Sequence, residues 1–246
     1  MSFVKRCGEK CVWWRPAARL ARSTGGVFRR FAGRGDPAGA AVAFQVAIDS
    51  GHADDAPEAA LKLGLLRAGQ GDLAGAVAAY QLAIDSGHVD QAPKAAFSLG
   101  NVRAEQGDLV GTVAAFQLAI DSGHADEAPK AAFNLGLLRK EQGDLAGAAA
   151  AYELAIDSGK FDQAPMAAYN LGNLRAGQGD LAGTIAAFQL AIDSGHADWA
   201  PKAAFNLGVI RAGQGDFAGA AAAYQLAIDS GNEDVAVPAR EKLRHL

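Results

Sequence analysis

Hydrophobic and small apolar positions recur along the chain with a fixed period of 36 residues. The block Ala-Tyr/Phe-Gln-Leu-Ala-Ile-Asp-Ser-Gly, with small substitutions, begins at Ala43, Ala79, Ala115, Ala151, Ala187 and Ala223. A Gly-Asp pair recurs between these blocks, always in the same register. A period of this length predicts a repeat architecture, because stacked neighbours bury the apolar face that one repeat cannot bury alone.

Each repeat is predicted to form two helices joined by a short turn. In the unit 129–164, Ala, Phe, Leu and Arg run without a breaker to Gln142, so we expect a first helix with Asp126 as its N-cap. Gly143 favours a left-handed turn, and Asp144 is expected to cap a second helix that ends before the next Ser-Gly pair. A turn this short makes the two helices antiparallel neighbours.

The predicted fold is all-α, a solenoid of stacked antiparallel helix hairpins with twelve or thirteen helices and no strands. The expected organisation is a basic N-terminal segment (1–35, disordered or a degenerate capping helix), a half repeat (36–56), five full repeats (57–236) and a C-terminal capping helix (237–246). Within the basic N-terminal segment, residues 27–34 are the part expected to form a degenerate first helix.

Glycine recurs inside the predicted helices, where each copy costs roughly 1 kcal/mol relative to alanine. The first helices contain Gly64, Gly100, Gly136, Gly172 and Gly208, and the second helices contain Gly75, Gly111, Gly147, Gly183 and Gly219. We expect these glycines to allow close approach between packed helix backbones, where a Cβ would clash.

The repeat resembles the tetratricopeptide repeat (TPR) family. Leu135, Gly136, Ala148 and Tyr152 match the family pattern, whereas its Trp and first Tyr have no counterpart. The unit is longer than the family's usual ~34 residues, and the phrase around each Pro is also similar to the TPR-related SLR repeats. The resemblance implies a right-handed α-solenoid that acts as a binding scaffold, with the ligand on the first helices. Neither family implies catalysis, so no enzyme activity is expected.

That resemblance makes the concave face of the first helices the candidate binding groove. The candidate partner-binding residues are Phe97, Asn101, Phe133, Asn134, Tyr169, Asn170, Asn173, Phe205 and Asn206. Asparagine can satisfy both the N–H and the C=O of an extended peptide. In the alternative interpretation the aromatic rings are core and the Asn side chains brace neighbouring helices.

Some TPR proteins bind the acidic C-termini of chaperones through a clamp of Lys, Asn and Arg. Asn101 and Asn134 match two positions of that clamp. Phe97 occupies the position of its first Lys, and Met166 and Asn170 occupy its last two positions. An acidic C-terminal ligand held in that way is therefore not expected.

Arginine also repeats once per unit. The row consists of Arg67, Arg103, Arg139, Arg175 and Arg211, and aspartates repeat as strictly at 49, 85, 121, 157, 193 and 229. We expect structural Arg–Asp pairing between the two rows, with a binding row for anionic partners as the alternative.

The second helices are almost free of charge. No charged residue lies between Asp72 and Asp85, and Glu153 is the one exception in the other copies. Outer helices of a solenoid normally carry a polar stripe. The alternative function is therefore a structural protein that self-associates through these helices.

The histidines and cysteines give little evidence for a metal or catalytic site. His52, His88, His124 and His196 occupy one linker position per repeat, too far apart to share a metal ion, so a linker or helix C-terminal role is expected. Cys7 and Cys11 form a lone C-x3-C pair, which is weak evidence for zinc. No cofactor or metal is expected. With two cysteines in 246 residues the chain fits a reducing, cytoplasmic compartment.

Charge separates the N-terminal segment from the repeats. Residues 1–35 hold nine Lys and Arg against Glu9 alone, a net +8, whereas the remainder holds 14 basic and 26 acidic residues, a net −12. The segment also contains Trp13 and Trp14, so contact with a membrane or nucleic acid is a further alternative. The leading prediction is a non-enzymatic scaffold that binds a peptide or protein segment of unknown identity.

Overall fold

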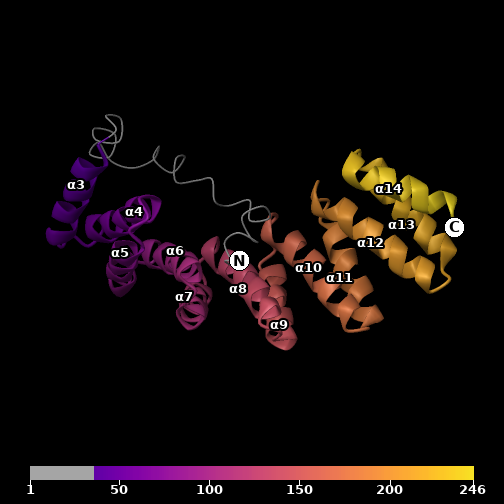
Figure 1. Ribbon diagram of the computed structural model, residues 1–246, viewed down its shortest axis with the longest axis horizontal. Helices are drawn as coiled ribbons and strands as arrows, with labels where there is room; N and C mark the ends of the chain where they lie inside the picture. The colour runs from indigo at the N-terminus through magenta and orange to yellow at the C-terminus, as the bar shows by residue number, and fades with distance from the viewer. Residues whose placement is uncertain (1–35) are drawn as a thin grey trace. The chain divides into compact units, whose positions relative to one another are not determined.

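A computed structural model describes residues 36–246, which fold into twelve helices without a strand in that range (Figure 1). The helices are α3 (Pro37–Asp49), α4 (Asp55–Gly69), α5 (Leu73–Asp85), α6 (Gln91–Gln106), α7 (Leu109–Asp121), α8 (Glu127–Glu141), α9 (Leu145–Asp157), α10 (Gln163–Gly177), α11 (Leu181–Asp193), α12 (Trp199–Gly213), α13 (Phe217–Asp229) and α14 (Glu233–Arg244). The predicted fold class, an all-α solenoid of helix hairpins, is confirmed.

The helices pack in sequence order within two compact units, divided inside α8 between Ala131 and Ala132. In the first unit α4 packs on α5 and α6 on α7; in the second, α10 packs on α11 and α12 on α13. Figure 1 shows first and second helices alternating along each one.

The turn between the two helices of a repeat forms as the sequence predicts. Gly143 has a φ of 79°, the left-handed value that glycine adopts without strain. The carboxylate of Asp144 then accepts a hydrogen bond of 2.9 Å from the N–H of Gly147, which caps α9 at its first turn. The same Asp cap begins α3, α5, α7, α11 and α13.

The first helices are capped differently from the prediction. Asp90 stands at the N-cap of α6 but its side chain makes no cap hydrogen bond. Instead, Nδ1 of His88 accepts from the N–H groups of Asp90 and Gln91, at 3.2 and 3.3 Å. His124 Nδ1 likewise accepts from the N–H of Asp126 at 3.2 Å. Of the two roles expected for histidine, the linker one is seen and the helix C-terminal one is not, because the imidazole ring reaches the free N–H groups of the following helix.

Each hairpin closes around one aromatic ring of its second helix. The rings of Tyr152 and Phe188 are almost completely buried, and a Cβ on Gly136 would lie 2.6 Å from Cδ1 of Tyr152. The first-helix glycines therefore allow close packing as predicted, although the atoms they admit belong to a ring rather than to the backbone.

The second-helix glycines serve another purpose than the one predicted. A Cβ on Gly147 would overlap the capping carboxylate of Asp144 and lie 2.8 Å from Cδ of Arg139. Glycine is thus required at this position by the cap and by the arginine that lies against it, and close approach of two helix backbones was the wrong explanation.

The C-terminal helix α14 covers the last repeat. It begins at Glu233, four residues before the expected boundary at 237, because Asn232 caps it through a 3.2 Å bond from the N–H of Asp234 to Oδ1. Val235 and Ala239 are buried against the last hairpin, and Leu243 packs beside them. The outward positions are charged, which suits a terminal repeat.

Candidate functional site

Successive first helices contact one another within each unit: α4 with α6, α10 with α12, and α12 with α14. Successive second helices make no such contact within either unit. The first-helix side is therefore the inner side of each unit, where a segment of another protein would touch several repeats at once.

The four predicted aromatic residues contact the buried rings of their own hairpins, but only Phe133 is itself buried, and Phe97 is partly exposed. Phe133 is buried with its centroid 5.9 Å from that of Tyr152, and Phe97 packs 6.0 Å from Phe116. Tyr169 and Phe205 remain partly exposed and contact the buried rings of their own hairpins. Tyr169 also touches Trp199 of the next first helix, with centroids 5.3 Å apart.

The predicted asparagines differ from one another in their partners. Asn170 donates from Nδ2 to the carbonyl oxygen of Met166 in its own helix, at 2.8 Å. Asn206 donates across to α10, at 3.1 Å to Oδ1 of Asn173 and at 3.4 Å to the hydroxyl of Tyr169. Asn101 and Asn134 also have partners. Bracing of neighbouring helices is thus a role that Asn206 performs directly.

The Asn206–Asn173 bridge is incompletely satisfied within the described part of the chain. The bridge uses Nδ2 of Asn206 and Oδ1 of Asn173. Oδ1 of Asn206 and Nδ2 of Asn173 have no hydrogen-bond partner among residues 36–246, which leaves one acceptor and one donor. Both side chains are partly exposed. An acceptor beside a donor is the arrangement that an extended peptide bond can satisfy.

A cation lies beside this bridge. Nζ of Lys202 sits 4.6 Å from the ring centroid of Trp199, a cation–π contact. No carboxylate in the described residues forms an ion pair with Lys202. The second unit thus presents a partly exposed indole, a lysine and two amides on neighbouring first helices. We name Tyr169, Asn173, Trp199, Lys202 and Asn206 the amide–indole surface.

Trp199 and Lys202 were missed by the sequence analysis. The signal that would have found them is variation between copies at a fixed repeat position. The position of Trp199 holds Asp55, Gln91, Glu127 and Gln163 in the earlier repeats, and that of Lys202 holds Glu58, Lys94, Lys130 and Met166. By contrast, the second helices are nearly identical. These two positions therefore distinguish the repeats from one another.

The arginine row is paired, but with a different aspartate from the one predicted. Nη1 of Arg103 lies 2.9 Å from Oδ2 of Asp108, and Nε of Arg139 lies 3.9 Å from Oδ2 of Asp144. Each arginine thus reaches the cap of its own second helix. Arg175 has a second acidic partner, Glu153, at 2.6 Å. Five of the six aspartates that close the second helices instead accept from a glutamine, as Asp85 does from Gln81 at 2.8 Å.

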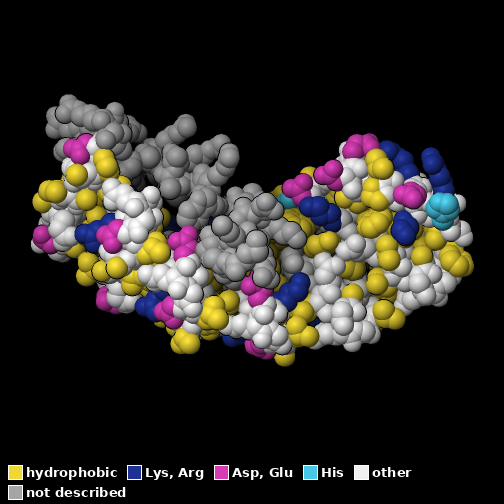
Figure 2. Space-filling view, viewed as in Figure 1, with side chains coloured by type: hydrophobic (Ala, Val, Ile, Leu, Met, Phe, Trp, Pro, Cys, Tyr) yellow, Lys and Arg dark blue, Asp and Glu magenta, His cyan; other side chains and the backbone are white. Residues whose placement is uncertain are grey.

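The outer helices expose a row of aliphatic residues. Val46, Leu82 and Leu118 occupy one position of successive second helices in the first unit, and Leu154, Leu190 and Leu226 occupy it in the second. About half of each side chain, or somewhat more, is exposed. Figure 2 shows hydrophobic side chains on the surface of both units.

Metal chemistry finds no support within residues 36–246, where no group of three or more His, Cys, Asp or Glu side chains is placed to hold an ion. None of the described helices is both long and apolar enough to traverse a bilayer. The predictions for residues 1–35, including Cys7, Cys11 and the basic segment, lie outside the described residues.

The comparisons with known proteins agree with this architecture. YrrB, described as a TPR protein with an unusual peptide-binding site, is 21% identical and superposes with a TM-score of 0.56 over 82% of this chain and 99% of its own. BtubC from P. vanneervenii is 18% identical, with a TM-score of 0.54 over 94% of this chain and 91% of its own. MamA from Desulfovibrio magneticus RS-1 is 18% identical, with a TM-score of 0.53 over 74% and 98%.

None of the curated proteins matches the chain. A sequence profile described as tetratricopeptide repeat matches residues 28–89, 113–163, 133–199 and 169–235, which together span most of the chain. The chain belongs to the tetratricopeptide repeat family.

Proposed function

We propose that this protein is a non-enzymatic interaction scaffold that binds an extended peptide segment on the inner, first-helix side of its repeats. The observation that carries the proposal is the donor and acceptor left open at Asn173 and Asn206, between neighbouring helices. The peptide-binding site described for YrrB, which shares the fold, supports the same class of function.

The amide–indole surface supplies each element of peptide recognition. The open carboxamide groups match one peptide C=O and one N–H, which fixes the position of the backbone. The exposed part of Trp199 offers a flat apolar surface for a side chain of the ligand. Lys202 adds a positive charge without an acidic partner in the described residues, so a segment with an acidic side chain at this point fits best.

The test begins with random peptides displayed on phage and selected on the full-length protein. The affinities of the selected peptides are then measured by calorimetry for wild type and for Asn173→Ala/Asn206→Ala. Each buried amide left unsatisfied costs about 1–3 kcal/mol. Since ~1.4 kcal/mol is tenfold in affinity, the double variant should bind at least tenfold more weakly.

The matched control is Gln189→Ala/Gln225→Ala, which removes two amides from the outer helices α11 and α13. It should leave the affinity unchanged. Circular dichroism and melting temperature are recorded for every variant. Equal affinity for wild type and the inner double variant, with both folded, would remove the first-helix surface as the binding site.

Self-assembly through the outer helices is the second candidate function. The half-exposed row that includes Leu82, Leu118, Leu154 and Leu190 is the observation that favours it. Light scattering across a hundredfold range of concentration tests this candidate. A monomer throughout that range would exclude it, whereas an oligomer lost in Leu154→Ser/Leu190→Ser would establish it. Tethering to a membrane or nucleic acid by residues 1–35 concerns residues outside the structure and stays a prediction.

A further inference from the structure

The first turn of α12 carries two residues of the amide–indole surface. Trp199 is the first residue of this helix and Lys202 lies one turn later, whereas Asn206 stands a further turn along. The ring of Trp199 contacts Tyr169, with centroids 5.3 Å apart, and Nζ of Lys202 lies 4.6 Å from the indole centroid. The order of this first turn therefore sets where a ligand meets the indole and the ammonium group.

One imidazole ring caps that turn. Asp198 occupies the N-cap position of α12, but its side chain makes no cap hydrogen bond. Nδ1 of His196 instead accepts from the N–H of Asp198 at 3.1 Å, and no other side chain of residues 36–246 accepts at this helix terminus. By comparison, His88 and His124 each accept two N–H groups. The side-chain cap of α12 thus depends on a single nitrogen atom.

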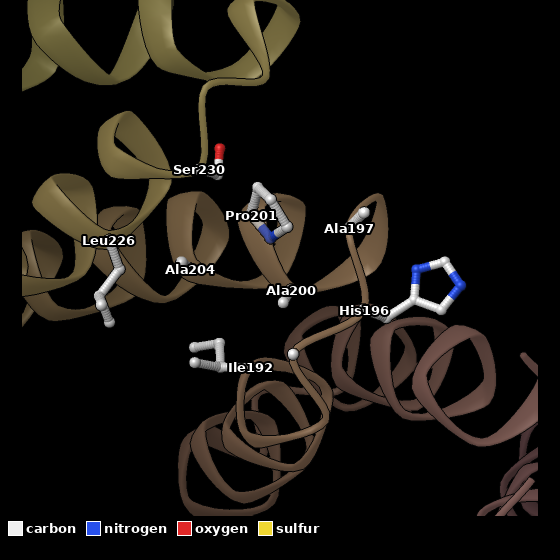
Figure 3. A pocket seen from close by; sticks show the side chains of 9 residues that line it. Ile192, His196, Ala197, Ala200, Pro201, Ala204, Leu226 and Ser230 are labelled. Carbon is white, nitrogen blue, oxygen red and sulfur yellow. The ribbon is translucent and has the colours of Figure 1, made fainter. Parts of the chain in front are cut away.

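The ring of His196 is held in turn by the linker between α9 and α10. Phe161 stacks on it, with centroids 5.1 Å apart and ring planes 26° apart, and Oδ1 of Asp162 lies 4.0 Å from Nε2. Figure 3 shows a hollow beside the next linker, with the His196 ring on the side away from Leu226. An aromatic residue at the position of Phe161 is particular to this linker, since the others hold Ala53, Val89, Ala125, Ala197 and Glu233.

Protonation of this ring would remove the cap. Histidine is the side chain that ordinarily changes charge between about pH 5 and 8. In the neutral ring Nδ1 accepts, so a second proton must go to Nδ1, which then meets the N–H of Asp198 as donor against donor. The positive end of the α12 dipole also disfavours an imidazolium at this helix terminus. A protonated His196 must therefore turn away from the first turn of α12.

The charges around the ring do not restore the cap. Asp162 attracts an imidazolium, but its carboxylate is 57% exposed and 4.0 Å away, and it faces Nε2 rather than Nδ1. No other carboxylate within residues 36–246 pairs with this ring. The adjoining segments also carry the charged residues Lys160, Asp193, Asp198, Lys202 and Asp229.

We propose that His196 is a positioning residue for the amide–indole surface: its neutral ring orders Trp199 and Lys202, and its protonation weakens peptide binding. The inference rests on the proposed function, because it concerns the affinity of the same surface. The ordered first turn requires the neutral ring, so binding favours the deprotonated protein and the affinity falls as the pH falls. A helix cap shifts an equilibrium by about 2- to 30-fold, which sets the upper limit of the effect.

Trp199 reports the order of the first turn without any ligand. In the full-length variant Trp13→Phe/Trp14→Phe it is the only indole that remains. Acrylamide quenching of this indole should be about twofold stronger at about pH 5.5 than at about pH 7.5, because the uncapped turn loosens. Adding His196→Asn should abolish the difference, since asparagine caps without titrating, as Asn232 caps α14.

Calorimetry at the same two pH values measures the affinity for a peptide. The probe is a histidine-free peptide selected by phage display on the full-length protein at about pH 7.5, where histidine is largely neutral. Wild type should bind about three- to tenfold more weakly at the lower pH. His196→Asn should keep most of the affinity and lose the pH dependence, whereas His196→Ala should bind weakly at both pH values.

The matched control is His88→Asn/His124→Asn, which replaces the same linker residue in the first unit. It should retain the pH dependence of wild type. Circular dichroism of every variant at both pH values confirms that it is folded.

Two results would overturn the proposal. One is quenching of Trp199 that does not change with pH, or that changes equally in His196→Asn. The other is a peptide affinity with the same pH dependence in wild type and in folded His196→Asn. If no peptide is selected, the proposed function fails by itself, and the quenching of Trp199 still decides whether His196 positions this turn.

Discussion

His124 and Asp90 join two successive repeats of the first unit: Nε2 of His124 lies 3.7 Å from Oδ1 of Asp90. The other ring nitrogen of His124 accepts the N–H groups of Asp126 and Glu127, at 3.2 Å each. Because Nδ1 accepts, the neutral ring carries its proton on Nε2, facing the carboxylate. One imidazole thus caps α8 and contacts Asp90, the N-cap residue of α6.

Replacing His124 separates its two roles. His124→Ala removes both the cap and the contact with Asp90, and loss of a helix cap costs about 0.5–2 kcal/mol of unfolding free energy. His124→Asn should retain most of that stability, because Asn232 at the equivalent linker position caps α14 with its own side chain. Urea unfolding of both variants measures the difference. Equal losses would show that the contact with Asp90, and not the cap, is the larger contribution.

Two glycines of α10 should respond in opposite directions to alanine. A Cβ on Gly172 would lie 2.6 Å from Cδ1 of Phe188, so Gly172→Ala should destabilise by about 1–3 kcal/mol through overpacking. Gly177 has open space around it, and Gly177→Ala should be neutral or stabilise by up to about 1 kcal/mol. Thermal unfolding compares them. A stable Gly172→Ala protein would mean that the ring can move aside.

Replacing an arginine of the row should reduce the unfolding free energy only slightly where its ion pair with aspartate is exposed to solvent. The side chains of Arg139 and Asp144 are 28% and 52% exposed, so Arg139→Ala should cost only about 0–1 kcal/mol. Arg175→Ala should cost more, because Arg175 also pairs with Glu153. In a double-mutant cycle Glu153→Gln should account for the difference. Arginine variants with normal unfolding but lost partner binding would instead indicate an anion-binding row.

The Tyr152 hydroxyl is fully buried without a hydrogen-bond partner in the described residues. Tyr152→Phe should therefore be neutral or stabilising, as expected from the Phe116 and Phe188 that occupy this position in other repeats. Tyr80→Phe is the control, since the Tyr80 hydroxyl is bonded to Ser98 and its loss should cost about 0.5–1.5 kcal/mol. Destabilisation of Tyr152→Phe by as much as the control would point to a hidden partner, such as buried water.

At alkaline pH the protein should lose stability, partly because Tyr80 and Tyr152 ionise more easily in the unfolded chain than in the folded protein. Burial raises the pKa of Tyr80 and Tyr152 well above the ordinary value, and the negative charges of Glu105 and Glu141 respectively raise it further. The unfolded chain releases its tyrosine protons near pH 10 while the folded protein retains them. Stability is therefore fully present below pH 10 and falls as the pH rises above it.

Tyr80→Phe/Tyr152→Phe should lower the dependence of unfolding free energy on pH between about 10 and 11. Urea titrations at several pH values measure this slope for the double variant and for wild type. An identical slope would contradict ionisation of the buried tyrosines as its cause.

The sequence by itself determined the repeat, its helices and their turns. The Gly143-Asp144 turn and the cap of α9 follow from local chemistry, because glycine accepts a left-handed φ and aspartate reaches the N–H three residues ahead. The periodic apolar positions and the resemblance to the TPR family gave the fold class. These features depend on interactions between residues close in sequence, and the same residues recur in every repeat.

Only the tertiary structure decided which side chains meet across repeats. The His124–Asp90 contact, the Arg175–Glu153 pair and the Asn206–Asn173 bridge join residues 22 to 34 positions apart. Identical residue types repeat at so many positions that spacing alone did not select the partners, and the arginine partner was predicted incorrectly for that reason. The amide–indole surface likewise depends on how α10 packs on α12, because that packing sets which hydrogen-bonding groups are used within the fold and which stay open for a ligand.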